Sequence, residues 1–154
     1  MFKIKRATPS MVDITAKPEV YREATARGQI KLNPNPIKLI KTGKIEKGDP
    51  LSTAKIAGTL AAKNTSYLIP LCHPLPITSV KIDTKTFNDI VEVEAIVKTT
   101  AKTGVEMEAL VATTVALLTI WDMTKQYEKD ERGQYPSTSI EKIRVVKKIK
   151  AEKK

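Results

Sequence analysis

The chain has 154 residues, of which 41% are hydrophobic, and it carries a formal net charge of +10. A chain of this length buries about 70% of the surface that its unfolded form exposes, so we expect one domain over residues 1–154. The basic surplus favours an anionic partner, and the single cysteine, Cys72, excludes an internal disulfide framework.

Residues 1–28 show no clean hydrophobic period, and we expect them to form an irregular N-terminal arm. The arm has no apolar core of the kind found in secretory signals, and no run reaches the roughly 20 apolar residues of a membrane span. The expectation is therefore a cytoplasmic chain without a membrane partner. One Cys and one His also make an all-nitrogen-and-sulfur metal site unfavourable, so no metal ligands are predicted.

A short strand is predicted at residues 29–32, and the prolines at 34 and 36 end it. Residues 49–66 have the pattern of a helix. Asp49 can cap its free amides, and Pro50 suits the first helical position. Apolar and small residues then recur at helical spacing up to the prolines at 70 and 74.

Residues 77–85 and 91–100 alternate between apolar and charged side chains on either side of Asn88-Asp89, which predicts a β-hairpin. Thr103 and Glu106 have the spacing of a capping box, and an apolar helix should follow to about residue 127. A last strand is expected at 140–149, with a frayed basic tail at 147–154. The order β-α-β-β-α-β predicts an α+β, ferredoxin-like sandwich, with helices on one face of an antiparallel sheet.

The loop at residues 70–76 contains three prolines and the only histidine, His73. One interpretation is a histidine that only packs in a proline turn. The other is that His73 binds a phosphate or moves a proton near neutral pH.

Two glutamates lie at the start of the long helix, where free amides favour anions. Glu106 has a structural explanation as the capping-box partner. Glu108 has none, and a carboxylate inside so apolar a helix should be paired or bound to a ligand. Glu108 is therefore the more informative of the two.

Near the other end of this helix, Asp122 and Lys125 are neighbours on one face. They form either a surface ion pair or a catalytic couple in which the carboxylate orients the ammonium group. Basic residues at Arg22, Lys47 and Lys63, and at position 102, are of the type that binds a triphosphate, but their spacing does not show that they converge.

Glu108 and Asp122 fall on nearly the same helix face, but roughly 21 Å apart along a straight helix. One small-molecule site in one chain can hardly contain both. Antiparallel copies of the helix in a two-fold dimer would bring Glu108 of one chain towards Asp122 of the other. We therefore expect a site at a subunit interface.

Several stretches together resemble one family. They read MVDI at 11–14, REA at 22–24, KGD at 47–49, AKIAG at 54–58, AAK at 61–63, LIPLCHPL at 68–75, TGVEMEAL at 103–110 and DM at 122–123, with Lys125 beyond. They are similar to the MoaC family, the cyclic pyranopterin monophosphate synthases of molybdenum-cofactor biosynthesis. The resemblance covers about residues 11–125.

The resemblance implies a lyase that acts after a radical GTP cyclase. Its substrate would be 3′,8-cyclo-7,8-dihydro-GTP, which it would convert to cyclic pyranopterin monophosphate with release of pyrophosphate. It also implies a homohexamer, a trimer of dimers with active sites at dimer interfaces. No cofactor is certain from the resemblance, although Mg²⁺ can accompany the triphosphate.

Carried over by position, the resemblance implies catalytic roles for three residues and substrate contacts for eight. The catalytic set is Asp122, Lys125 and Lys47. The substrate-binding set is Leu71, Cys72, His73, Met107, Glu108, Glu106, Arg22 and Lys63. The chain departs from the family's glycine-rich Lys-Ser-Gly-Gly-Lys-Ser-Gly ending, in place of which it has the basic residues 147–154.

Two alternatives belong to other functional classes. A basic ferredoxin-like domain can bind RNA on its sheet, but residues 77–85 and 91–100 contain no aromatic side chain on which bases would stack, so no nucleic-acid partner is expected. The other alternative is a pterin-binding scaffold without catalysis. Turnover of the cyclised nucleotide distinguishes this scaffold from the enzyme.

Overall fold

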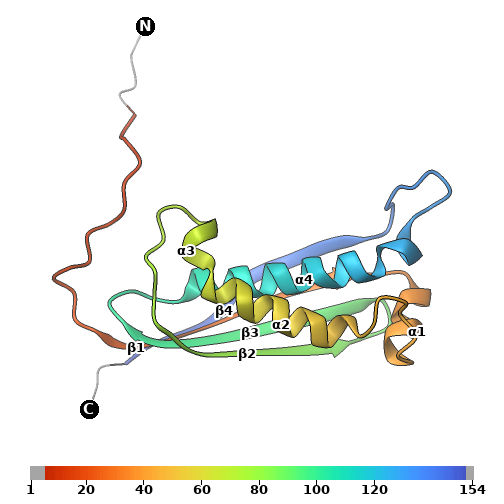
Figure 1. Ribbon diagram of the computed structural model, residues 1–154, viewed down its shortest axis with the longest axis horizontal. Helices are drawn as coiled ribbons and strands as arrows, with labels where there is room; N and C mark the ends of the chain where they lie inside the picture. The colour runs from red at the N-terminus through yellow and green to blue at the C-terminus, as the bar shows by residue number, and fades with distance from the viewer. Residues whose placement is uncertain (1–5, 152–154) are drawn as a thin grey trace, which may run out of the picture.

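The computed structural model describes residues 6–151, which form a four-stranded antiparallel sheet with helices packed on one face (Figure 1). The strands are β1 (Val20–Lys31), β2 (Ile77–Thr86), β3 (Ile90–Ala101) and β4 (Ser139–Ala151), in the sheet order β2-β3-β1-β4. The helices are α1 (Pro34–Lys41), α2 (Pro50–Lys63), α3 (Thr65–Leu68) and α4 (Glu106–Glu128). This arrangement confirms the predicted α+β, ferredoxin-like architecture.

The β2-β3 hairpin follows from the alternation in its sequence. On β3, Val91, Val93, Ala95 and Val97 are fully buried, whereas the residues between them are only half-buried. The register pairs Val80 with Val97 and Asp83 with Glu94. One face of the hairpin therefore contributes to the core and the other carries charges.

Helix α4 lies along the helix-bearing face of the sheet beside α2 (Figure 1). Its small residues allow this close packing, since Ala109, Ala112 and Ala116 are fully buried. Gly58 on α2 is the tightest point, because a Cβ there would lie 2.8 Å from the carbonyl oxygen of Ala112. The two helices are thus held side by side along most of their length.

α4 is also long and apolar enough to pass a length and composition test for a membrane span. Half of its apolar window is buried inside the protein, and the helix supplies much of the core. The core helix of a globular domain passes the same test, so this result is weak evidence for a membrane span.

Two predicted boundaries are wrong at the sheet. The arm was expected to reach residue 28, but β1 begins at Val20 and pairs with β3 along its whole length. Its inward residues, Ala24, Ala26 and Gly28, are too small to give a strong hydrophobic pattern. The last strand was expected to end at residue 149 and the frayed tail to begin at 147, but β4 continues to Ala151 and pairs with β1 up to that residue. Residues 152–154 of that tail lie outside the described residues.

The predicted capping box is also absent. The helix begins at Glu106 with Val105 at the cap position, and no side chain bonds to the cap amides. The Glu106 carboxylate instead bonds to Lys148 of β4, with 2.6 Å between Oε1 and Nζ. Glu106 therefore pairs with a lysine of β4, and helix capping does not explain its presence at this position.

Candidate functional site

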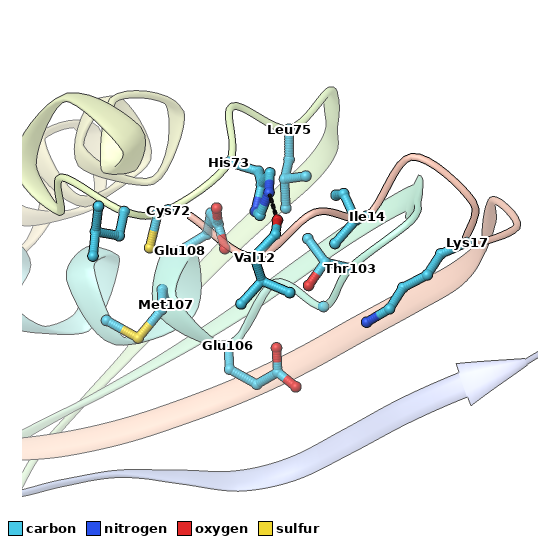
Figure 2. A pocket seen from close by; sticks show the side chains of 12 residues that line it. Val12, Ile14, Lys17, Cys72, His73, Leu75, Thr103, Glu106, Met107 and Glu108 are labelled. Atoms are coloured by element: carbon cyan, nitrogen blue, oxygen red, sulfur yellow. Dashed lines mark hydrogen bonds between the residues drawn. The ribbon is translucent and has the colours of Figure 1, made fainter. Parts of the chain in front are cut away.

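The sequence segments around Cys72 and Glu108 meet in one pocket at the N-terminal end of α4, with a cavity of about 320 Å³ (Figure 2). Its wall combines the proline-rich loop, the first turn of α4 and the N-terminal arm. The lining residues are Val12, Ile14, Lys17, Leu71, Cys72, His73, Leu75, Thr103, Gly104, Glu106, Met107 and Glu108. A cavity of this size suits a small molecule, since ligand sites usually measure about 300–1,000 Å³.

The arm closes one side of the pocket and is held there by two side chains. The Nε2 atom of His73 lies 2.8 Å from the carbonyl oxygen of Val12 (Figure 2). Because a carbonyl can only accept, Nε2 is the donor. Lys102 donates from Nζ to the carbonyl oxygen of Thr15 at 2.8 Å. His73 is thus hydrogen-bonded to the arm. Neither the packing role nor the phosphate or proton-transfer role considered from the sequence included this bond.

Glu108 is the buried carboxylate of the site. It is only 3% exposed, and its Oε2 atom has no hydrogen-bond partner among the described residues. Burial raises the pKa of Glu108, and the nearby charge of Glu106 adds to the effect. Burial also raises the pKa of the Cys72 thiol, as does the neighbouring Glu108. The sequence predicted a partner for Glu108, but the described residues supply none to Oε2. This oxygen is therefore available to a ligand.

Glu106 lies at the rim of the same pocket and is charged. Burial acts to raise the pKa of Glu106, but the hydrogen bonds from Lys148 and the backbone, together with the charges of Lys148 and Arg22, outweigh it, so that the pKa falls below its usual value. The two glutamates, two residues apart on α4, are thus in opposite environments. One has a basic partner and the other has a buried, unpartnered oxygen.

A second cluster forms at the opposite end of α4. Asp122 accepts hydrogen bonds from two lysines, with Lys47 Nζ at 3.0 Å from Oδ2 and Lys125 Nζ at 2.9 Å from Oδ1. Lys47 is brought there by the turn at Gly48, which has a φ of 101°, and by the Asp49 cap that starts α2. The structure therefore brings Lys47 together with Asp122 and Lys125, which their spacing in the sequence could not show.

The charges in this cluster stabilise one another. Hydrogen bonds from Lys125 and then Lys47 lower the pKa of Asp122. The Asp122 carboxylate in turn raises the pKa of Lys125. Proton transfer by Lys125 as a base would require a lowered pKa, so in the single chain this lysine is suited to donating a proton.

The remaining predicted residues lie near the pocket rather than near Asp122. Lys63, at the end of α2, lines a smaller cavity of about 200 Å³ together with His73 and Glu108. Arg22, on β1, lines a cleft that shares Thr103, Gly104 and Glu106 with the main pocket. Eight predicted substrate-binding residues thus lie at one end of α4, and three predicted catalytic residues lie at the other.

Several pocket residues were not predicted from the sequence. Val12 and Ile14 were placed in the irregular arm, and although they belong to the family-like stretch MVDI, they were not assigned to the site. Lys148 was placed in both the predicted strand and the predicted tail, and Lys150 in the tail alone, whereas the pairing of β4 with β1 puts both on the side of Arg22. Among residues 6–151, no cluster of three His, Cys, Asp or Glu residues could hold a metal ion.

The amino-acid sequence matches the model of a known protein family. A model of the MoaC family aligns with residues 11–151, which includes both ends of α4 and strand β4. The chain belongs to the MoaC family.

Relatives from three archaea extend along nearly the whole MoaC chain. A protein of Pyrococcus furiosus is 58% identical over 93% of this chain and 92% of its own length. One from Sulfolobus acidocaldarius is 55% identical over 92% of this chain and 99% of its own length, and one from Methanoregula boonei is 53% identical over 92% of both. Each is named a probable cyclic pyranopterin monophosphate synthase.

Proposed function

We propose that this protein is a cyclic pyranopterin monophosphate synthase, a lyase that converts 3′,8-cyclo-7,8-dihydro-GTP to cyclic pyranopterin monophosphate and pyrophosphate. The observation that carries the proposal is that the two longest family-like stretches, at 68–75 and 103–110, form one pocket of ligand size in a MoaC-family chain. The names of its relatives agree with this reaction.

In this proposal the main pocket binds the guanine-derived ring system. The pocket offers an apolar wall from Leu71 and Met107 and a carboxylate from Glu108, whose unpartnered oxygen can accept a hydrogen bond from a ring N–H. Cys72 and His73 shape the side next to the arm. A ring donor would satisfy the buried oxygen that the chain itself leaves without a partner.

The Asp122 cluster supplies the proton chemistry. Opening and reclosing rings requires protons to move on nitrogen and oxygen, and lysine ammonium groups can donate them. Lys125, whose pKa Asp122 raises, is the proton donor in this scheme. Lys47 reaches the same carboxylate from a separate element and adds a second ammonium group to the cluster.

Such chemistry requires a second chain, because the pocket and the Asp122 cluster are roughly 21 Å apart on α4. We propose a homohexamer built from dimers in which the pocket of one protomer faces the Asp122 cluster of its partner. Exposed apolar side chains on the helix layer support an interface there, among them Ile56, Leu60, Met107 and Leu118. A surface of this kind on a folded chain is typical of an assembly contact.

The proposed reaction also implies a source for the substrate and a cellular compartment. The substrate would come from a radical GTP cyclase, and the protein would act in the cytoplasm. Mg²⁺ would enter with the triphosphate of the substrate rather than through a protein site.

The RNA-binding alternative has no comparable support. The sheet face away from the helices carries ion pairs, including Arg27 with Glu94 and, at 3.8 Å, Lys98 with Glu23. Its one aromatic side chain on β1, Tyr21, bonds through its hydroxyl to Glu23. RNA-binding sheets of this topology instead present aromatic rings to stack on bases.

The test is turnover of the purified protein with 3′,8-cyclo-7,8-dihydro-GTP, with pyrophosphate and the pyranopterin both measured. We expect both products from the wild type and neither above background from Lys47→Ala. Lys44→Ala, an exposed lysine in the same segment, is the matched control and should retain activity. A well-folded wild type that binds the substrate but releases no pyrophosphate would point to the scaffold function instead.

A further inference from the structure

The segment between α1 and α2 carries Lys47, whose ammonium group must remain at the end of α4 for the proposed chemistry. The Nζ atom of Lys47 lies 3.0 Å from Oδ2 of Asp122 and 3.1 Å from its carbonyl oxygen. Both side chains are about half exposed, and an exposed lysine–carboxylate pair contributes little stability by itself. The position of Lys47 therefore depends on how the backbone around it is held.

Glu46, the residue directly before Lys47, is bonded to α4 at two atoms. Its backbone N–H donates to the hydroxyl oxygen of Tyr127 at 3.0 Å. Its Oε2 atom accepts a hydrogen bond from Nε2 of Gln126, also at 3.0 Å. Because 80 positions of the chain separate Glu46 from Gln126, only tertiary packing brings them together. Lys47 is therefore connected to α4 through its neighbour as well as through its own side chain.

The two partners of Glu46 lie one turn beyond Asp122 on the same helix. Gln126 is four residues after Asp122, and residues four apart lie on one face of a helix. Tyr127 follows directly and is half-buried. The two bonds to Glu46 are thus made one turn, about 5.4 Å along the helix axis, from the carboxylate that Lys47 contacts.

The backbone on both sides of Glu46 forms a turn with a defined shape. Ile45 is only 5% exposed, and its carbonyl oxygen accepts a hydrogen bond from the amide of Gly48 at 3.0 Å. Among the residues that the structure describes, the bond to Tyr127 is the only hydrogen bond between the backbone of residues 45–48 and α4. Loss of the Tyr127 hydroxyl would therefore release this backbone from α4 while the turn itself stays intact.

We propose that Tyr127 and Gln126 are positioning residues of the reaction. Through their bonds to Glu46 they keep the ammonium group of Lys47 on Asp122. Neither residue touches the substrate in this role. The inference deepens the proposed function, and it rests on that function only for the reaction whose rate would change. The placement of Lys47 can be measured without any turnover.

The first test is Tyr127→Phe, which removes the accepting hydroxyl and keeps the ring. We expect kcat with the cyclised nucleotide to fall about tenfold with little change in KM, since a misplacement of about 1 Å can cost roughly 100-fold. The second readout is the rate at which an amine-acylating reagent modifies Lys47 in the full-length protein, followed by mass spectrometry. This rate should rise several-fold because the ammonium group is no longer held on Asp122, while the exposed Lys44 reacts as before.

Tyr21→Phe is the matched control, because the Tyr21 hydroxyl also bonds to a glutamate but lies on the sheet face away from α4. It should leave both readouts unchanged. Gln126→Ala and Glu46→Ala should each lower kcat less than Tyr127→Phe does. Because both remove the same side-chain contact, the double variant should lose no more activity than either single variant.

Wild-type kcat together with wild-type reactivity of Lys47 in Tyr127→Phe would overturn the proposal, as would additive losses from Gln126→Ala and Glu46→Ala. A lower kcat with unchanged reactivity of Lys47 would also overturn it, since Tyr127 would then act in another way. Failure of the proposed function is a separate result. In that case the wild type would form no pyranopterin, while the modification rate of Lys47 would still differ between Tyr127→Phe and Tyr21→Phe.

Discussion

The two ends of α4 each carry a carboxylate, but in opposite environments. Glu108, at the N-terminal end, is 3% exposed and has an oxygen without a partner, whereas the side chain of Asp122, at the C-terminal end, is 54% exposed and bonded to two lysines. Burial raises the pKa of Glu108, and the lysines lower the pKa of Asp122. The same chemical group thus has a raised pKa at one end of the helix and a lowered pKa at the other.

In the proposed two-chain site, each end of α4 supplies one half. The N-terminal end has a concave wall and the unpartnered carboxyl oxygen of Glu108. The C-terminal end has the Asp122 cluster, none of whose three side chains lines the main pocket. A site that needs both halves can form only where a second chain joins them, because α4 holds the ends roughly 21 Å apart.

The largest expected effect is loss of the acid–base group. Lys125→Ala should lower turnover about 10³-fold, in the range that general acid–base catalysis contributes, and leave pyrophosphate binding unchanged. The measurement is the steady-state rate at saturating cyclised nucleotide. Lys129→Ala, an exposed lysine one turn beyond, is the control. An equal loss in both variants would remove the special role of the Asp122 cluster.

Glu108→Gln tests the pocket half. The neutral amide removes the cost of a buried charge without a partner, so we expect the free energy of unfolding at neutral pH to rise by about 1–3 kcal/mol while turnover falls. Since the folded-state pKa of Glu108 is raised above 4.5, its penalty is absent below that pH and grows as pH rises through the folded value.

Denaturant unfolding of wild type and Glu108→Gln at pH 4 and at pH 8 checks this sign. The gain in stability should appear only at the higher pH. Glu131→Gln, at an exposed position, should show no pH-dependent difference from the wild type. A gain of the same size at both pH values would contradict the buried-charge explanation.

Gly58→Ala tests the packing that fixes the distance between the two ends. The new Cβ would lie 2.5 Å from Cδ1 of Ile82 and 2.8 Å from the carbonyl oxygen of Ala112. Overpacking should exceed the gain in helix propensity and destabilise the fold by about 1–2 kcal/mol. Thermal unfolding measures this loss of stability, with Lys55→Ala, a substitution at an exposed position of the same helix, as the control. A more stable variant would mean that α2 and α4 are free to separate.

The smallest expected effect is a titration shift at the C-terminal end. Asp122 stabilises the ammonium form of Lys125, so Asp122→Asn should lower the pKa of Lys125. An NMR titration of the lysine side chains with Lys125 assigned would detect it. An unchanged pKa of Lys125 in Asp122→Asn would mean that the ion pair does not form in solution.

The fold was largely predictable because local patterns agree with it. The alternation at 77–85 and 91–100 predicted the β2-β3 hairpin, and the Asp49-Pro50 pair predicted the start of α2. β1 was mostly missed, because its inward side chains are alanine and glycine and its outward ones are polar, which weakens the period of two. The Thr103–Glu106 capping box failed because Lys148, far along the chain, competes for Glu106.

The spacing of the candidate residues along the chain did not predict which of them lie together. Lys47 reaches Asp122 only because α2 packs against α4, and no spacing in the sequence encodes that approach. The bond between His73 and the arm likewise depends on tertiary placement. By contrast, the wide separation of Glu108 and Asp122 follows from helix geometry alone, and for that reason a two-chain site could be predicted before the structure.

The most direct test of the two-chain site mixes two inactive variants, Glu108→Ala and Lys125→Ala, after co-expression with different tags. In a mixed dimer one site combines the intact pocket of the Lys125→Ala chain with the intact cluster of its partner. Random mixing should therefore restore turnover at about a quarter of the sites, while each variant alone stays inactive. Tagged mixed oligomers that form but recover no activity would contradict the account, as would a fully active monomer.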